Sequence, residues 1–172
     1  VREGAVYLRD SPRHWVLDVA AGASTWTAAA DLPSPRNHLA GVALGGKIYA
    51  VGGQRLGDEV SGNRADVHVY NPAADRWAAV ADLPRPLGHI SAATFVHRGR
   101  LVVVMGTTQG RSKTPEVFAY DPATNRWGEI PNMPGARSAT VAGSIGGEIV
   151  LSTGTVGGSP LDTTWVGRWE PD

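Results

Sequence analysis

Apolar residues along the chain form short runs, and each run ends in glycine, proline, aspartate or asparagine. The segment 100–105, for example, is Arg-Leu-Val-Val-Val-Met and is followed at once by Gly106. The 22 glycines and 12 prolines divide the whole chain in this way. Strand-length apolar runs bounded by turn residues are typical of all-β proteins. We therefore expect short antiparallel strands and almost no helix.

The order of these runs repeats. Trp26, Trp77 and Trp127 lie 51 and 50 residues apart, and each is followed five residues later by Asp or Asn and seven later by proline. The segment 70–77, Tyr-Asn-Pro-Ala-Ala-Asp-Arg-Trp, matches 120–127, Tyr-Asp-Pro-Ala-Thr-Asn-Arg-Trp. A fixed period of about 50 residues is typical of a propeller or solenoid array.

Each repeat predicts four antiparallel strands, separated by a glycine hairpin, a long loop and an Asx-Pro turn. The first strands are expected at 38–44, 90–96 and 139–145, the second at 47–51, 100–105 and 148–153, and the third at 67–70, 117–120 and 165–169. The fourth strand starts at each tryptophan. The chain then divides into a partial blade 1–32, a blade 33–83, a blade 84–133 and a partial blade 134–172.

This order of motifs resembles the kelch repeat, in which a double glycine, a Tyr-Asx-Pro segment and a tryptophan follow one another. The first unit has Gly52-Gly53, whereas the other two units keep only the second glycine, Gly106 and Gly154. The resemblance extends from about residue 16 to residue 171. It implies kelch-type β-propeller blades, with the repeated tyrosines and tryptophans largely buried between neighbouring blades.

The two ends do not form complete blades. Residues 5–8, 15–18 and 26–29 fit strands two to four of one blade, and the chain after Asn132 supplies strands one to three of another. Together these make about three and a half blades, whereas known propellers have about four to eight. We therefore expect either the remainder of a longer propeller or self-association through the open blade edges.

Composition excludes several function classes. The net charge is zero and the isoelectric point is about 7.1, so there is no basic field for nucleic acid or anionic lipid. No apolar run approaches the roughly 18 residues of a membrane-spanning helix. The absence of cysteine excludes disulfides, thiolate zinc sites and a cysteine nucleophile. Fourteen arginines against two lysines suggest a GC-rich bacterial genome, and a secreted or periplasmic location is favoured over the cytoplasm.

Strand direction fixes which loops share a face. Because strands alternate, loops joining strand two to three lie on the same face as those joining strand four to the next blade, and the opposite face has only tight turns. Long loops on a rigid scaffold are where binding residues concentrate. The expected ligand contacts on this face are Arg36, Asn37, His38, His89 and Arg137, with Gln54, Arg55 and Gln109 from the loops between strands two and three.

His38 and His89 both lie twelve residues after their tryptophan, so they should project at matching places near the channel mouth. They have two interpretations: a polar ring that binds a glycan, a peptide or a metal, or side chains that bond the neighbouring backbone. Two histidines from different blades lack the short ligand spacing of a metal site. We predict no metal and no cofactor.

The resemblance implies two function classes. The first is a non-catalytic interaction module, and the second is an enzyme of the galactose oxidase or sialic-acid mutarotase type. The oxidase needs a tyrosine cross-linked to cysteine, which this chain lacks. A mutarotase would need a polar channel, built here from Arg36, His38, His89 and Arg137. Fold alone does not decide between these. We predict a module that binds a protein or glycan, with a sugar-active enzyme as the alternative.

Overall fold

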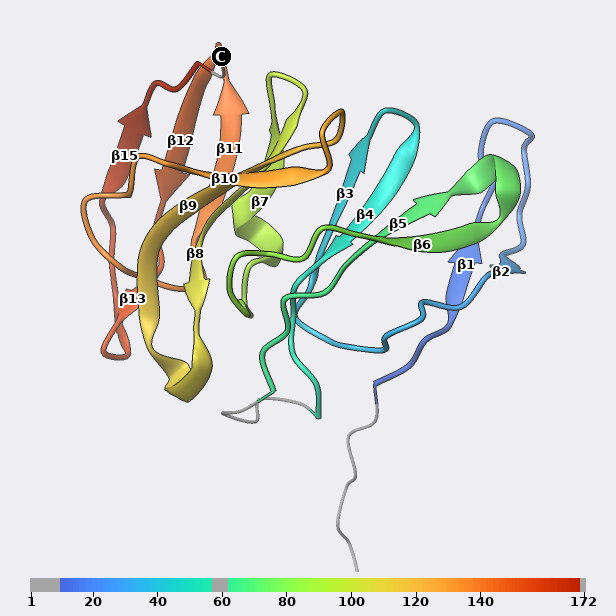
Figure 1. Ribbon diagram of the computed structural model, residues 1–172, viewed down its shortest axis with the longest axis horizontal. Coiled ribbons are helices and arrows are strands. Elements are labelled where there is room, and N and C mark those ends of the chain that lie inside the picture. The colour runs from blue at the N-terminus through green and yellow to red at the C-terminus, as the bar shows by residue number, and fades with distance from the viewer. Residues whose placement is uncertain (1–9, 57–61, 171–172) are drawn as a thin grey trace, which may run out of the picture.

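The structure, a computed structural model, describes residues 10–56 and 62–170 as antiparallel sheets placed side by side (Figure 1). Two sheets have four strands each, in sequence order across the sheet. The first complete blade contains β3 (Ala40–Leu44), β4 (Lys47–Val51), β5 (Val67–Asn71) and β6 (Arg76–Val80). The second contains β7 (Thr94–His97), β8 (Arg100–Thr107), β9 (Lys113–Asp121) and β10 (Arg126–Ile130). The predicted all-β fold with four-stranded propeller blades is confirmed.

Smaller sheets flank the two complete blades. One end has a pair, β1 (His14–Val16) and β2 (Thr27–Ala29), and the other has β11 (Val141–Ile145), β12 (Glu148–Ser152) and β15 (Thr164–Gly167). A hairpin of β13 (Thr155–Val156) and β14 (Ser159–Pro160) lies in the loop before β15. The described residues contain no α-helix, only the 3₁₀ turns η1 (Pro72–Ala74), η2 (Ser91–Ala93) and η3 (Gln109–Arg111). The strand expected at 5–8 lies outside the described residues.

The first strand of each blade begins later than predicted. The expected starts were 38, 90 and 139, whereas the strands begin at 40, 94 and 141. His38, His89 and Ala139 have φ values of 49°, 55° and 54°, so the backbone is left-handed there and leaves the ladder. A single bridge precedes each of them, between Asn37 and Gln54 in the first blade. The pattern of apolar and polar residues does not reveal a positive φ at a residue other than glycine, so the sequence could not predict these later strand starts.

Backbone geometry explains why only the second glycine of the double glycine persists. Gly53, Gly106 and Gly154 have φ values of 106°, 134° and 102°, and an added Cβ would lie 2.6 Å from a heavy atom of the adjoining segment. The first position is left-handed too: Met105 and Thr153 have φ values of 61° and 64°. In the first unit, however, an added Cβ at Gly52 would lie 2.8 Å from the carbonyl oxygen of Leu87. Side chains can adopt that conformation at a cost, but a Cβ at the second position has no space.

Gly106→Ala is expected to lower the free energy of unfolding by about 2–3 kcal/mol, because it adds a steric clash to a strained φ. Gly99→Ala is the matched control: its φ is 76°, but no atom lies within 4 Å of the added Cβ, so only the backbone cost remains. Urea unfolding of both variants checks this difference. Equal losses of free energy of unfolding in the two variants would show that the close packing at Gly106 does not contribute to stability.

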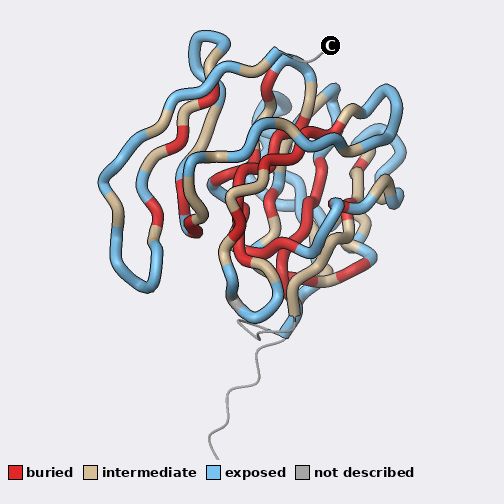
Figure 2. The backbone as a smooth tube through the Cα atoms, turned by 60° about the vertical axis from the view of Figure 1, so that its left-hand side comes forward, coloured by how far each residue is buried: buried red, intermediate tan, exposed pale blue. Residues whose placement is uncertain are grey.

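Two hydrophobic cores lie between neighbouring sheets, where Figure 2 shows the buried segments concentrated. β8 contributes to both: Leu101 and Val103 face the first blade, and Val102 and Val104 face the sheet of β11 and β12. Alternate residues of a strand point to opposite faces, so a central strand packed on both sides is a continuous apolar run. This accounts for the Leu-Val-Val-Val segment. Each blade therefore depends on its neighbours for burial.

Each blade is also tied to the preceding one by a hydrogen-bonded group that we call the inter-blade clasp. Trp77 Nε1 donates to the carbonyl oxygen of Ala30 at 2.9 Å, and the Ala30 amide donates to Asp75 Oδ1 at 2.8 Å. Tyr70 OH donates to the same carboxylate oxygen at 2.8 Å. The same bonds recur one repeat later at Trp127, Ala81, Asn125 and Tyr120.

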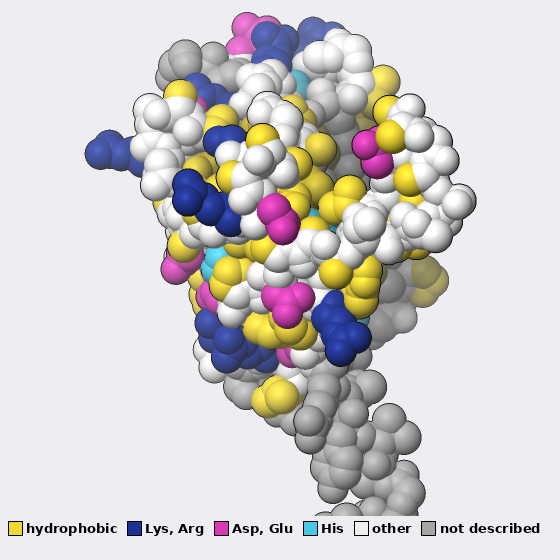
Figure 3. Space-filling view, turned by 90° about the vertical axis from the view of Figure 1, so that its right-hand side faces the viewer, with side chains coloured by type: hydrophobic (Ala, Val, Ile, Leu, Met, Phe, Trp, Pro, Cys, Tyr) yellow, Lys and Arg dark blue, Asp and Glu magenta, His cyan; other side chains and the backbone are white. Residues whose placement is uncertain are grey.

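Trp77 and Trp127 lie between blades as predicted, but they are not fully buried. Trp77 and Trp127 are half-buried, whereas Tyr70 and Tyr120 are buried. The reason is the clasp, which holds each indole at the outer part of the blade with its N–H on the preceding segment. Trp26 is 65% exposed, because no described blade precedes it. Figure 3 looks onto this end of the molecule, where Trp15 and Val19 are exposed as well.

Candidate ligand-binding face

Arg36 lies beneath the loop face rather than on it. Its side chain is 4% exposed, and its guanidinium donates to the carbonyl oxygens of Gly52 (2.6 Å), Ser34 (2.7 Å) and Ala50 (2.9 Å). A fourth bond reaches the carbonyl oxygen of Asp66 at 3.3 Å. The planar fork of arginine suits several acceptors at once. Arg36 thus joins the loop before β3 to β4 and to the start of β5.

Arg137 occupies the same position two repeats later and is also buried. Its Nη1 donates to the carbonyl oxygen of Thr153 at 2.8 Å, and its Nη2 donates to Thr163 Oγ1 at 3.0 Å. The guanidinium lies 3.7 Å from the ring centroid of Trp165, a cation–π contact. In the repeat between them, the buried Leu87 fills this place. These contacts account for both arginines structurally, and direct ligand contact by either stays a prediction.

His38 and His89 come together on the loop face. Their rings are stacked, with centroids 4.3 Å apart and planes inclined by 26°. His38 is exposed and His89 is half-buried, so the stack presents one edge to solvent. The two residues belong to neighbouring blades, and each projects from a backbone position with positive φ. The equal spacing from their tryptophans correctly indicated matching places.

A chain of side-chain amides supports this stack. Gln54 Oε1 lies 2.8 Å from His38 Nδ1, and Gln54 Nε2 donates to Asn63 Oδ1 at 2.8 Å. Asn63 Nδ2 then donates to the carbonyl oxygen of Thr107, in the second blade, at 2.7 Å. Gly88 lies directly against this chain, because a Cβ there would be 2.6 Å from Gln54 Cγ. The chain orients His38 and crosses from one blade to the next.

Asn63 is not among the residues that the sequence singled out. Two other predicted ligand contacts, Asn37 and Gln109, have surroundings of their own. Asn37 Nδ2 donates to Asp10 Oδ1 at 2.7 Å, and Asp10 Oδ2 accepts the amide of Leu56 at 3.0 Å. Gln109 is exposed in η3, at the tip of the β8–β9 hairpin, and its side chain has no contact with the histidines among the described interactions.

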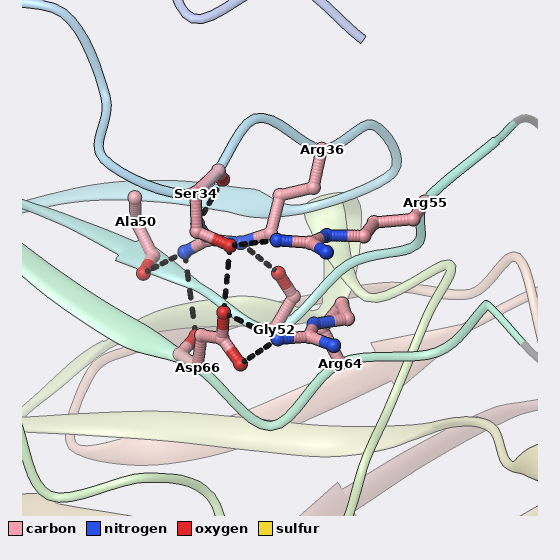
Figure 4. A network of polar contacts seen from close by, with 7 residues as sticks. All are labelled: Ser34, Arg36, Ala50, Gly52, Arg55, Arg64 and Asp66. Atoms are coloured by element: carbon pink, nitrogen blue, oxygen red, sulfur yellow. Dashed lines mark hydrogen bonds and ion pairs between the residues drawn. The ribbon is translucent and has the colours of Figure 1, made fainter.

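Arg55 belongs to a second polar group, shown in Figure 4, which we call the arginine cluster: Arg36, Arg55 and Arg64 around Ser34 and Asp66. Arg64 Nη2 contacts both carboxylate oxygens of Asp66, at 2.9 and 3.0 Å. Burial acts to raise the pKa of Asp66, but hydrogen bonds from Arg64 and Ser34 outweigh it and hold that pKa below its usual value. Asp66 is therefore an ionised anchor for the cluster.

The part of the chain that the structure describes offers no group of three or more His, Asp or Glu side chains arranged to hold a metal ion. Nor do these residues include a helix of the length and apolarity required to cross a membrane. The described side chains of the loop face include imidazoles, amides and guanidinium groups, together with the carboxylates of Asp10 and Asp66. The imidazole, amide and guanidinium groups recognise polar and anionic surfaces through hydrogen bonds.

The family follows from sequence comparison. A model of the kelch motif matches residues 35–84, the segment that holds Arg36, His38, Gln54 and Trp77. Beta-scruin of Limulus polyphemus is 30% identical over 155 residues, covering 85% of this chain and 16% of scruin. The kelch-like protein terF of Aspergillus terreus is 38% identical over 73 residues, covering 42% of this chain and 16% of that protein. The chain belongs to the kelch-repeat proteins.

An F-box/kelch-repeat protein of Arabidopsis thaliana is 38% identical over 70 residues, covering 41% of this kelch-repeat chain and 18% of that protein. The chain thus spans about a sixth of the length of these curated relatives. Among solved structures, that of YjhT superposes with a TM-score of 0.75 at 20% identity, covering 94% of this chain and 61% of YjhT. Similarity at that identity establishes a common fold and nothing further.

Proposed function

We propose that this kelch-repeat chain is a non-catalytic interaction module that binds a protein through the face carrying the long loops. The observation that carries the proposal is the His38–His89 stack, which presents one edge to solvent and is held across two blades by the Gln54–Asn63 chain. Kelch-repeat proteins generally mediate protein interactions, which supports this choice. Side chains that are ordered before binding lose little entropy on association, so they favour affinity.

A sugar-active enzyme is the alternative that the sequence leaves open. Its polar channel was expected to use Arg36, Arg137 and the two histidines. The guanidinium groups of both arginines donate to backbone carbonyls, so the histidines are the members of that set that face solvent. No observation on this face specifically favours turnover of a sugar. We therefore prefer binding, and treat a glycan ligand as an outcome that the screen below would detect.

Association with further blades also stays a prediction. Exposed apolar side chains occur at both ends of the described chain, with Trp15 and Trp26 at one end and Val141 and Val166 at the other. Blade faces are normally covered by a neighbouring blade. Either additional blades or a second copy of this chain would provide that cover.

Replacing His38 and His89 together by alanine is expected to abolish partner binding while lowering the free energy of unfolding by only about 1–2 kcal/mol, because His38 is exposed and water can replace its bond to Gln54. Ala139 supplies the structural reason: it is an alanine at the equivalent position with φ of 54°, so the backbone there accepts this side chain. The measurement is affinity capture on immobilised protein and glycan arrays, followed by titration of each captured ligand. Thermal melting of both proteins runs in parallel.

Lys47→Ala is the matched control, because Lys47 is exposed at the β3–β4 hairpin on the tight-turn face. It should bind as the unmodified protein does. Retained binding in the double histidine variant would reject the loop face as the binding surface. Capture of sugars alone, with turnover that either histidine change abolishes, would support the enzyme alternative instead.

A further inference from the structure

Among the described residues, the hydrogen-bonded arginine cluster contains more guanidinium groups than carboxylates. Three guanidinium groups surround one carboxylate, so the hydrogen-bonded network of Figure 4 has a net charge of 3 − 1 = +2. Two further carboxylates lie nearby. Asp10 accepts bonds from Asn37 and the Leu56 amide, and Asp82 acts on Arg36 more weakly than Asp66, Arg64 or Arg55 do. The excess is concentrated where Arg55 and Arg64 reach the surface.

The positive charges also act on one another. Burial lowers the pKa of Arg36 most, Asp66 opposes this, and the like charges of Arg64 and Arg55 lower the pKa further. An added anion beside these groups would relieve the repulsion between them. Arg64 Nε has no hydrogen-bond partner among the described residues, although it is buried. Within the described residues, the hydrogen-bonded cluster therefore has more guanidinium groups than carboxylates and one buried N–H group without a partner.

Arg55 is the member that a ligand can reach. Its side chain is exposed, and among the described residues it donates only to Ser34 Oγ, from Nη2 at 3.1 Å. Ser34 Oγ in turn donates to Asp66 Oδ2 at 2.7 Å. This relay orients the guanidinium while using one of its five N–H donors. An oriented guanidinium with remaining donors is suited to bind a planar carboxylate with two parallel bonds.

We propose that Arg55, assisted by the charge of Arg64, binds the carboxylates of an acidic segment in the partner protein. This rests on the proposed function, because it assigns the chemistry of the protein that the loop face binds. A net charge of +2 matches two adjacent Asp or Glu side chains. Arg55 takes one carboxylate directly, and Arg64, held beside Asp66, stabilises the second through its charge. A phosphate group shares this chemistry, and the experiment below separates the two sources.

The test is fluorescence anisotropy with a short labelled peptide that contains two adjacent glutamates. A peptide with glutamines in their place is the ligand control. Arg55→Gln should raise the Kd for the acidic peptide about tenfold, a change equivalent to about 1.4 kcal/mol. Added salt should weaken binding, because charges at the surface are screened. Arg76→Gln, an exposed arginine on the tight-turn face, removes the same charge and should leave the Kd unchanged.

Three results would overturn this inference. Equal Kd values for the acidic and glutamine peptides would exclude carboxylate recognition. Equal losses in Arg55→Gln and Arg76→Gln would indicate a general charge effect. Binding of inorganic phosphate that is lost in Arg55→Gln, without peptide binding, would assign the site to phosphate instead. The proposed function fails separately: it is rejected if the double histidine variant keeps its captured partner, whatever charge that partner has.

Discussion

Arg36→Ala is expected to lower the free energy of unfolding by about 3–5 kcal/mol, since it leaves several buried carbonyl oxygens without a donor. The guanidinium donates to four backbone carbonyls, including those of Gly52 and Ala50. A buried acceptor that loses its partner costs about 1–3 kcal/mol, and water admitted into the space recovers part of that cost. The expected total is therefore below the sum over four acceptors.

Two variants test the interpretation of Arg36. Arg36→Lys keeps the charge but not the planar fork, so it should recover less than half of the loss. Arg55→Ala removes an exposed arginine from the same cluster and should cost less than about 1 kcal/mol. Urea unfolding at neutral pH measures the free energy of unfolding of these two variants and of Arg36→Ala. An Arg36→Ala variant as stable as Arg55→Ala would mean that Arg36 does not support the blade, and ligand contact would become its best explanation.

Trp77→Ala should lower the free energy of unfolding by about 3 kcal/mol. This is near the lower end of the range for buried aromatic residues, because the indole is only half-buried. The loss combines packing between blades with the bond from Nε1 to the carbonyl oxygen of Ala30. Trp77→Phe separates these contributions, because phenylalanine keeps an aromatic ring but has no N–H donor. This change should lower the free energy of unfolding by about 1 kcal/mol.

Trp26 provides an internal control at the same repeat position. It is 65% exposed and has no preceding described blade to bond, so Trp26→Ala should cost less than about 1 kcal/mol. Differential scanning calorimetry on the three variants gives the comparison. Similar losses at Trp26 and Trp77 would contradict the inter-blade clasp, because the two positions differ in their contact with a preceding blade.

The strands of the first complete blade were predictable because their signals are local and periodic. The short apolar run of β4, the glycine hairpin at 45–46 and the Asn71-Pro72 turn each predict their own element. The strands expected at 100–105 and 117–120 are instead longer: β8 continues to Thr107 past an irregularity between Val104 and Gly106, and β9 begins at Lys113. That extension depends on pairing across the hairpin, which no single segment encodes.

The matching placement of the two histidines was predictable, but the contacts of the other candidate residues were not. The equal spacing from Trp26 and Trp77 placed His38 and His89 at equivalent points of neighbouring blades, and the structure brings their rings into contact. It could not show that Arg36 turns inward, because the direction of a long side chain depends on where the nearby carbonyls point. Asn63 was missed for a related reason: its loop has no periodic pattern, and its role comes from contact with the next blade.

The most direct test of the binding face is amide hydrogen exchange on the kelch-repeat chain with and without its captured partner. The account predicts slower exchange in the partner complex for peptides covering residues 37–39, 53–56 and 87–90, around the histidine stack and the arginine cluster. The hairpins at 45–47, 98–100 and 146–148 on the tight-turn face should be unchanged. Protection of those hairpins, with the loop face exchanging as in the free protein, would contradict it.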